Sequence, residues 1–132
     1  TCCLVAPDGV ARLRPLDRDT AQKQLTDLVV WYLKGLQRPL PVTARTALVY
    51  LRGLPTGSPG MNSDSIRQKA QTAARQAYQG NGYHSAGEVG YNAYLARAYP
   101  DYDALYRADN HLFLHLAEVL YAPLLKALQE AP

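Results

Sequence analysis

The clearest hydrophobic pattern in the chain lies between residues 19 and 36 and has the period of a helix. Apolar side chains recur there every three or four residues, at Ala21, Leu25, Leu28, Val29, Tyr32, Leu33 and Leu36. This spacing predicts an amphipathic helix that packs on a core through one face. Asp19, with Gln22 three residues later, is the predicted cap, and Gly35 and the Pro-Leu-Pro run at 39–41 are predicted to end the helix. Trp31 lies beside this stripe and is predicted to pack against a neighbour.

The first 16 residues show a different pattern, with short apolar runs on either side of a turn. Residues 4–6 and 10–13 flank Pro7-Asp8-Gly9, in which proline presets a turn and glycine accepts a positive φ. In the second run Ala11 and Leu13 point to one side and Arg12 and Arg14 to the other. Residues 1–16 are therefore predicted to form a β-hairpin.

Four further helices are predicted downstream. One follows Thr43 and ends at Gly53, a second runs from Ser63 or Asp64 to Gln79, a short one covers residues 92–98, and the last begins near Asp109, with a kink expected at Pro123. The proline- and glycine-rich residues 54–62 are predicted to form a flexible loop. The expected fold class is therefore α+β, mostly helical with an N-terminal hairpin, in a single domain over residues 1–132.

Composition narrows the class of protein. The chain has 132 residues, 48% hydrophobic and 19% charged, which is typical of a globular domain. Its longest apolar run, residues 28–33, is too short to cross a membrane. Adjacent Cys2 and Cys3 cannot form a disulfide framework, so a cytoplasmic location is expected. The chain does not begin with methionine, and we interpret it as a fragment of a larger protein.

Three groups of residues suggest catalytic or metal chemistry, and none is convincing. His111 and His115 have the spacing of a metal-binding pair, but no third ligand is evident. His84, Ser85 and Glu88 lie together in a glycine-rich stretch, without the strand-to-helix turn that presents a serine nucleophile. The glycines at 80 and 82 lack the spacing of a phosphate-binding loop. We expect no catalytic residue, no metal site and no cofactor.

The distribution of charge is compatible with contact to nucleic acid. Residues 1–80 carry 11 basic and five acidic side chains, whereas residues 81–132 carry three and six. The candidate phosphate contacts are two arginines of the hairpin and three basic residues of the 63–79 helix: Arg12, Arg14, Arg67, Lys69 and Arg75. A solvated face or a surface for a protein partner explains the same residues equally well.

Several stretches resemble the C-terminal region of the RecC family, the gamma subunit of exodeoxyribonuclease V. The resemblance lies in residues 13–17, 32–36 and 39–42, and continues at 70–78, at 87–88 and at 116–125. It implies RecB and RecD subunits as partners in a complex that unwinds and degrades DNA ends. It also implies that the chain is similar to the C-terminal part of a PD-(D/E)XK nuclease-like domain that has lost its catalytic residues. No D-x-K or E-x-K triplet occurs in the chain.

The resemblance and the residues together give a functional hypothesis. The chain is expected to be a non-catalytic scaffold and DNA-handling part of a helicase–nuclease subunit in double-strand-break repair, with no membrane and no small-molecule substrate. The hydrolase activity would belong to the whole complex. The alternative is a module that contacts only proteins, for which Trp31, Tyr94 and Tyr99 are the candidate contacts.

Overall fold

The computed structural model describes residues 2–7, 9–55, 63–82 and 85–129, and it begins with the expected hairpin. Strands β1 (Cys2–Ala6) and β2 (Gly9–Leu13) are antiparallel, in a register that pairs Cys2 with Leu13 and Ala6 with Gly9. On β2, Ala11 and Leu13 are half-buried and Arg12 is exposed, so the predicted alternation is confirmed. Most of the loop expected at 54–62 lies outside the described residues.

Helix α1 (Arg18–Gln37) forms as predicted, but with different ends. The N-cap is Asp17, not Asp19: its carboxylate accepts a hydrogen bond of 2.8 Å from the Thr20 amide. The Thr20 side chain and, to a smaller extent, this amide lower the pKa of Asp17. Asp19 lies inside the first turn, where a negative charge interacts favourably with the helix dipole. Gly35 does not end the helix. The end comes at Arg38, which is extended because proline disfavours the helical region in the residue before it.

Three of the helices between α1 and α6 form where the sequence predicts them. Helix α2 (Ala44–Arg52) begins after Thr43, α3 (Ser63–Gln79) ends at Gly80, and α5 (Ala93–Ala98) is capped by Asn92. A short helix, α4 (Gly87–Gly90), was not predicted. Gly87 has a φ of +64°, a conformation that glycine adopts at little cost.

The last helix, α6 (Tyr102–Gln129), starts earlier than expected and is interrupted. Ala108 has extended backbone angles, and Asp109, Asn110 and His111 are left-handed, so a joint divides α6 into 102–107 and 112–129. The break therefore lies at this joint, whereas Pro123 lies inside the helix without non-helical angles. An Arg38–Asp109 ion pair of 2.9 Å connects the joint to the end of α1.

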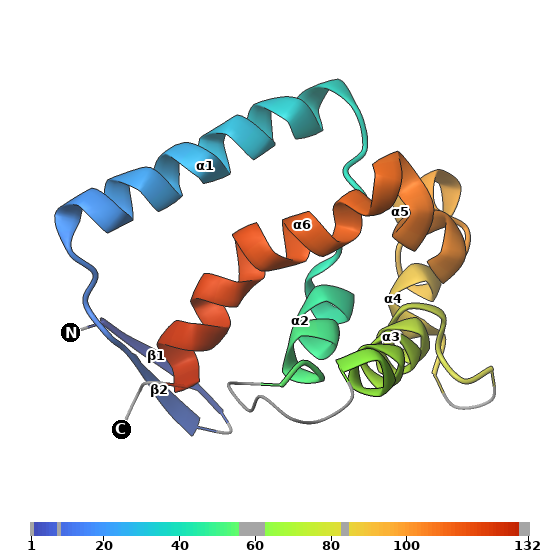
Figure 1. Cartoon of the computed structure of the whole chain (residues 1–132), viewed down its shortest axis with the longest axis horizontal. Coiled ribbons are helices and arrows are strands. Elements are labelled where there is room, and N and C mark those ends of the chain that lie inside the picture. The colour runs from blue at the N-terminus through green and yellow to red at the C-terminus, as the bar shows by residue number, and fades with distance from the viewer. Residues whose placement is uncertain (1, 8, 56–62, 83–84, 130–132) are drawn as a thin grey trace.

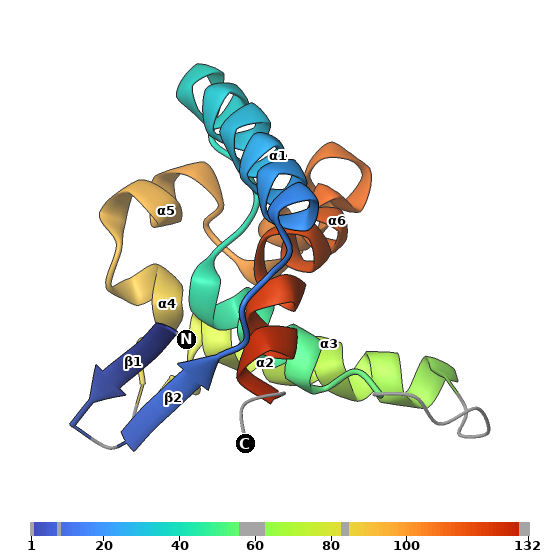
Figure 2. The same cartoon turned by 90° about the vertical axis from the view of Figure 1, so that its left-hand side faces the viewer.

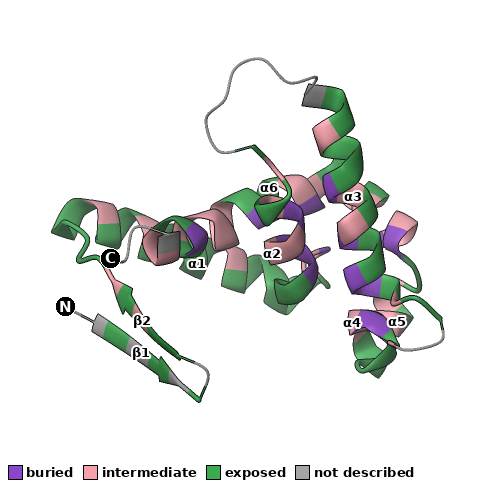
Figure 3. Ribbon diagram, turned by 90° about the horizontal axis from the view of Figure 1, so that it is seen from below, coloured by how far each residue is buried: buried purple, intermediate pink, exposed green. Residues whose placement is uncertain are grey.

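The core lies where α2, α3 and α6 meet, and the buried residues gather on these helices (Figure 3). Aromatic side chains make up much of it. Tyr50, Tyr78, Tyr102 and Phe113 are buried and touch one another edge-on or tilted. Helix α3 contributes Tyr78 and small alanines, one of which, Ala70, allows α2 to approach closely at Gly53. Helix α3 is thus part of the core, although most of its other residues are polar.

Helix α1 lies outside this core, so the prediction that it packs on a core through its apolar face is wrong. It has no buried residue, and Figure 1 shows it above α6, joined to the rest of the fold through residues 38–43. Within the described residues one helical segment, Tyr102–Leu128, is long and apolar enough to cross a membrane by length and composition alone. Core helices of soluble proteins meet the same criterion, and here Phe113, Leu116 and Ala117 are buried within the fold.

Removal of the Tyr78 hydroxyl and removal of the Tyr102 hydroxyl should have different effects on the free energy of unfolding. The Tyr78 hydroxyl donates a hydrogen bond of 2.5 Å to the Tyr99 carbonyl, whereas the Tyr102 hydroxyl is buried without a hydrogen-bond partner among the described residues. We expect Tyr78→Phe to lower the free energy of unfolding by about 1 kcal/mol, and Tyr102→Phe to leave it unchanged or raise it by about 1 kcal/mol. Urea denaturation of both variants measures the difference, and equal losses would contradict it.

Candidate functional site

The most unusual surface of the molecule is the outer face of α1. Leu25, Val29, Tyr32, Leu33 and Leu36 share one side of this helix, and we call them the α1 apolar face. All five are exposed, from 48% at Val29 to 66% at Leu36. In Figure 2, α1 lies at the edge of the molecule, beside α6. A helix that exposes its apolar face lacks the packing that normally stabilises such a helix.

The inner face of α1 is mostly polar. Thr20, Gln24 and Trp31 are half-buried and share one side of the helix, opposite the α1 apolar face. The Trp31 ring meets the His115 ring edge-on, with 5.7 Å between centroids, and the Lys34 ammonium lies 4.1 Å from its centroid. The neighbour of Trp31 is therefore α6 of the same chain. Its role as a contact to a partner stays a prediction.

The hairpin is also open on the outside. Among the described residues it forms a two-stranded sheet, so neither outer edge is paired with a further strand. Val5 and Val10 are exposed, as is Leu16 in the segment that leads to α1. An open strand edge and exposed branched residues can accept another strand or an apolar surface.

The five candidate phosphate contacts do not form one surface. Arg12 lies on β2, and Arg14 follows that strand. On α3, Arg67 lines a cavity toward α2 and α6, whereas Lys69 lies on another side, beside Ser65 and Gln68. The structure thus separates residues that the sequence grouped, and their contact with DNA stays a prediction.

Arg75 is already engaged within the fold. Its two terminal nitrogens donate to both Asp103 carboxylate oxygens at 2.7 and 2.8 Å, and its guanidinium lies 5.2 Å from the centroid of the Tyr102 ring. The hydrogen bonds from Arg75 lower the pKa of the Asp103 carboxyl and raise that of the guanidinium. Asp103 therefore compensates the positive charge of Arg75, which makes Arg75 the weakest of the five candidates.

The two tyrosines suggested as partner contacts differ in their surroundings. Tyr94 on α5 is 88% exposed, and its ring is available to a partner. Tyr99 is half-buried, and its hydroxyl donates to the Pro39 carbonyl at 2.9 Å. Tyr99 therefore fixes the segment between α1 and α2. Burial raises the pKa of its hydroxyl, so this donor stays protonated at neutral pH.

Glu88 has a structural role that the sequence did not reveal. Its carboxylate accepts hydrogen bonds from the amides of Arg45 and Thr46, at 3.2 and 3.0 Å, and from the Thr46 hydroxyl at 2.8 Å. It thereby caps the start of α2, where the N-cap residue Thr43 makes no side-chain capping bond. The absence of an acidic residue from the first turn of α2 was the only signal in the sequence.

The candidate catalytic and metal groups are not assembled. Ser85 accepts from the Gly87 amide at 3.3 Å, Glu88 caps α2, and His84 lies outside the described residues. His111 is in the left-handed joint with its Nδ1 3.0 Å from the Tyr106 carbonyl, so it does not share a helical turn with His115. In the part of the chain that the structure describes, no three potential metal ligands come together.

A comparison with known families finds a match in the N-terminal part of the chain. Residues 1–55 match the family model of the RecC C-terminal domain. This part of the chain is RecC-like. The resemblance inferred from the sequence is thereby confirmed for residues 1–55, and its continuation at 70–78 and 116–125 stays a prediction. No curated protein and no solved structure gives a significant match.

Most of the exposed large apolar side chains among the described residues lie in the RecC-like part. It comprises β1, β2, α1 and α2, and so includes the α1 apolar face and the hairpin. The family match also makes the chain a candidate part of a RecC subunit. The likeness to an inactive nuclease fold is a separate prediction, to which no solved structure adds support.

Proposed function

We propose that the chain is a docking part of a RecC-type subunit, in which the α1 apolar face binds another protein surface of the helicase–nuclease complex. The observation that carries this proposal is that all five residues of that face are exposed, by 48–66%, within the RecC-like residues. Burying a leucine side chain contributes about 1.5–3 kcal/mol, so five such residues supply a strong driving force. The partners proposed are the RecB and RecD subunits, in the cytoplasm, and the role proposed is a scaffold without a catalytic residue.

DNA handling is the second part of the proposal and has weaker support. Arg12 and Lys69 are exposed, but they lie on separate elements, and Arg75 is paired with Asp103. A phosphate backbone needs several cations along one surface. The arrangement of the described basic residues therefore favours protein docking over DNA contact.

A variant of the α1 apolar face tests the proposal. We expect Leu25→Glu with Leu33→Glu to lower the affinity for the RecB or RecD partner about 100-fold, because each central apolar contact is worth more than about 1 kcal/mol and a buried charge adds to the cost. Size-exclusion chromatography of the chain with each purified subunit measures co-migration, and circular dichroism confirms that the variant stays helical.

The matched control is Gln68→Glu with Gln76→Glu, which adds the same two charges to the exposed side of α3. It is expected to co-migrate like the unmodified chain. Equal loss in both double variants would mean that net charge matters and the face does not. Failure of the folded, unmodified chain to bind either subunit would contradict the proposal.

A further inference from the structure

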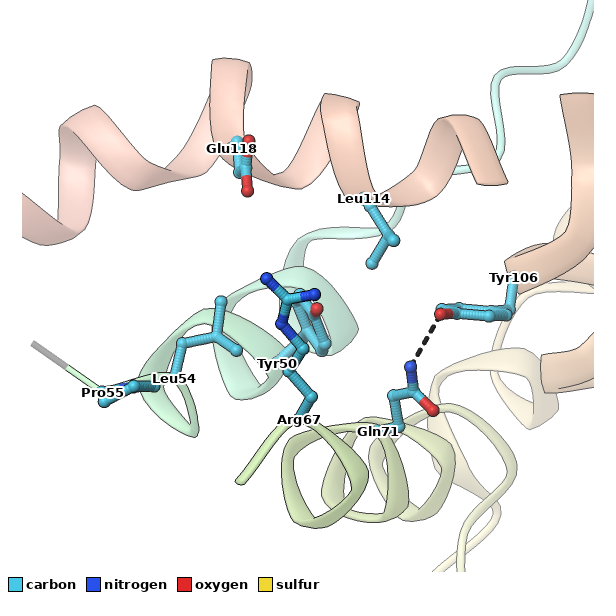
Figure 4. A pocket seen from close by; sticks show the side chains of 8 residues that line it. All are labelled: Tyr50, Leu54, Pro55, Arg67, Gln71, Tyr106, Leu114 and Glu118. Carbon is cyan, nitrogen blue, oxygen red and sulfur yellow. Dashed lines mark hydrogen bonds between the residues drawn. The ribbon is translucent and has the colours of Figure 1, made fainter. Parts of the chain in front are cut away.

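A cavity of about 390 Å³ lies between α2, α3 and α6, on a different part of the molecule from the α1 apolar face. Figure 4 shows its side chains, with Tyr50 and Leu54 on the α2 side, Arg67 and Gln71 on α3, and Leu114 and Glu118 on α6. Its volume is in the range of sites for small molecules. The RecC-like residues contribute only the α2 wall.

The walls present hydrogen-bond donors that the fold does not use. Gln71 Nε2 donates to the Tyr106 hydroxyl at 2.7 Å, so the proton of that hydroxyl remains to be donated to a ligand. Arg67 and Tyr50 both line this cavity (Figure 4). Neither Arg67 nor Glu118 forms a hydrogen bond or ion pair with another described residue.

The charges of Arg67 and Glu118 both affect the pKa of the Tyr50 hydroxyl. Burial raises the pKa of its hydroxyl, the Glu118 carboxylate also raises it, and Arg67 opposes them. The Tyr50 hydroxyl therefore stays protonated and able to donate. A cation, two phenol donors and an anion thus border one cavity whose remaining walls, Leu54 and Leu114, are apolar.

We propose that this cavity binds a free α-amino acid with an apolar side chain. Its carboxylate would be held by Arg67 and the hydroxyls of Tyr50 and Tyr106, its ammonium by Glu118, and its side chain by Leu54 and Leu114. A guanidinium with two hydroxyl donors selects an oxyanion, because charge-assisted hydrogen bonds are about twice as strong as neutral ones. An anion on the same cavity selects a ligand that also carries a positive group, which distinguishes an amino acid from a phosphate.

Titration of the intact chain with three related probes tests the proposal. L-Phenylalanine, N-acetyl-L-phenylalanine and L-phenylalanine amide have the same side chain, and NMR shifts of the Gln71 side-chain amide report occupancy of the cavity. We expect saturable shifts with L-phenylalanine, and affinity at least about tenfold lower for the amide, which lacks the carboxylate. The N-acetyl probe has no ammonium group, so it cannot interact with the Glu118 carboxylate and is expected to bind more weakly than L-phenylalanine.

Substitutions of Arg67 and Glu118 test which group of the ligand each of these two side chains binds. Arg67→Gln should lower the affinity for L-phenylalanine at least about tenfold. Lys69 is a cation on another side of the same helix, so Lys69→Gln should leave this affinity unchanged. Glu118→Gln should lower the affinity for L-phenylalanine and leave the affinity for the N-acetyl probe unchanged. The absence of saturable shifts, equal binding of the amide, or tighter binding of a nucleoside monophosphate than of L-phenylalanine would overturn the proposal. None of these results depends on docking through α1.

Discussion

Gly87→Ala is expected to unfold the protein partly or completely at 37 °C. Gly87 has a φ of +64°, and a Cβ at this position would overlap the backbone at the Tyr78 carbonyl oxygen and the Gly80 nitrogen. Left-handed strain and a forced backbone shift each cost about 1–3 kcal/mol, so we expect a loss of about 4 kcal/mol in the free energy of unfolding. Since small domains are stable by about 5–15 kcal/mol, this is a large fraction of the total. Thermal denaturation followed by circular dichroism measures it.

Gly82→Ala is the matched control for this prediction. Gly82 also has a positive φ, of +75°, but a Cβ there meets no atom of the described residues within 4 Å. It should cost only about 1–2 kcal/mol, the strain of a left-handed alanine. If the two substitutions destabilised the protein equally, close packing of α4 against the end of α3 would not be the reason that residue 87 is glycine.

Glu88→Ala is the second substitution with a large expected effect. It removes the acceptor for two α2 amides and for the Thr46 hydroxyl, and Thr46 is fully buried. Each buried donor left without a partner costs about 1–3 kcal/mol, so we expect a loss of about 3 kcal/mol in the free energy of unfolding. Amide hydrogen exchange should accelerate most at the first turn of α2, because that turn loses its cap.

Two controls separate the cap from the loss of an acidic side chain. Glu88→Gln keeps one acceptor oxygen and should lose about half as much stability as the alanine variant. Glu118→Ala removes an exposed carboxylate without a hydrogen-bond partner among the described residues, and should change stability by less than about 0.5 kcal/mol. A Glu88→Ala variant as stable as Glu118→Ala would show that α2 does not depend on this cap.

The two predictions concern the same short segment. Residues 85–92 contain α4, where Gly87 allows close approach to the end of α3 and Glu88 provides the hydrogen bonds to α2. In the sequence these residues suggested a loop with a possible catalytic group. In the structure they connect the helices that carry the core.

The sequence alone determined much of the local structure and indicated a likeness to one family. The period of apolar residues, the Pro-Asp-Gly turn and the capping residues predicted the hairpin, α1, α2, α3 and α5 nearly to their ends, because these signals act over a few neighbouring residues. The order of short stretches indicated the RecC family, which the match over residues 1–55 confirms.

Only the tertiary structure decided which surfaces are inside. The stripe of α1 has the pattern of a core helix, yet it faces outward, while Tyr50, Tyr78 and Tyr102 form the core. Arg75, predicted to contact phosphate, is paired with Asp103 across 28 residues, and Glu88 caps a helix 42 residues away. Periodicity shows that a helix has an apolar face but not what covers it, because burial and pairing depend on residues distant in the chain.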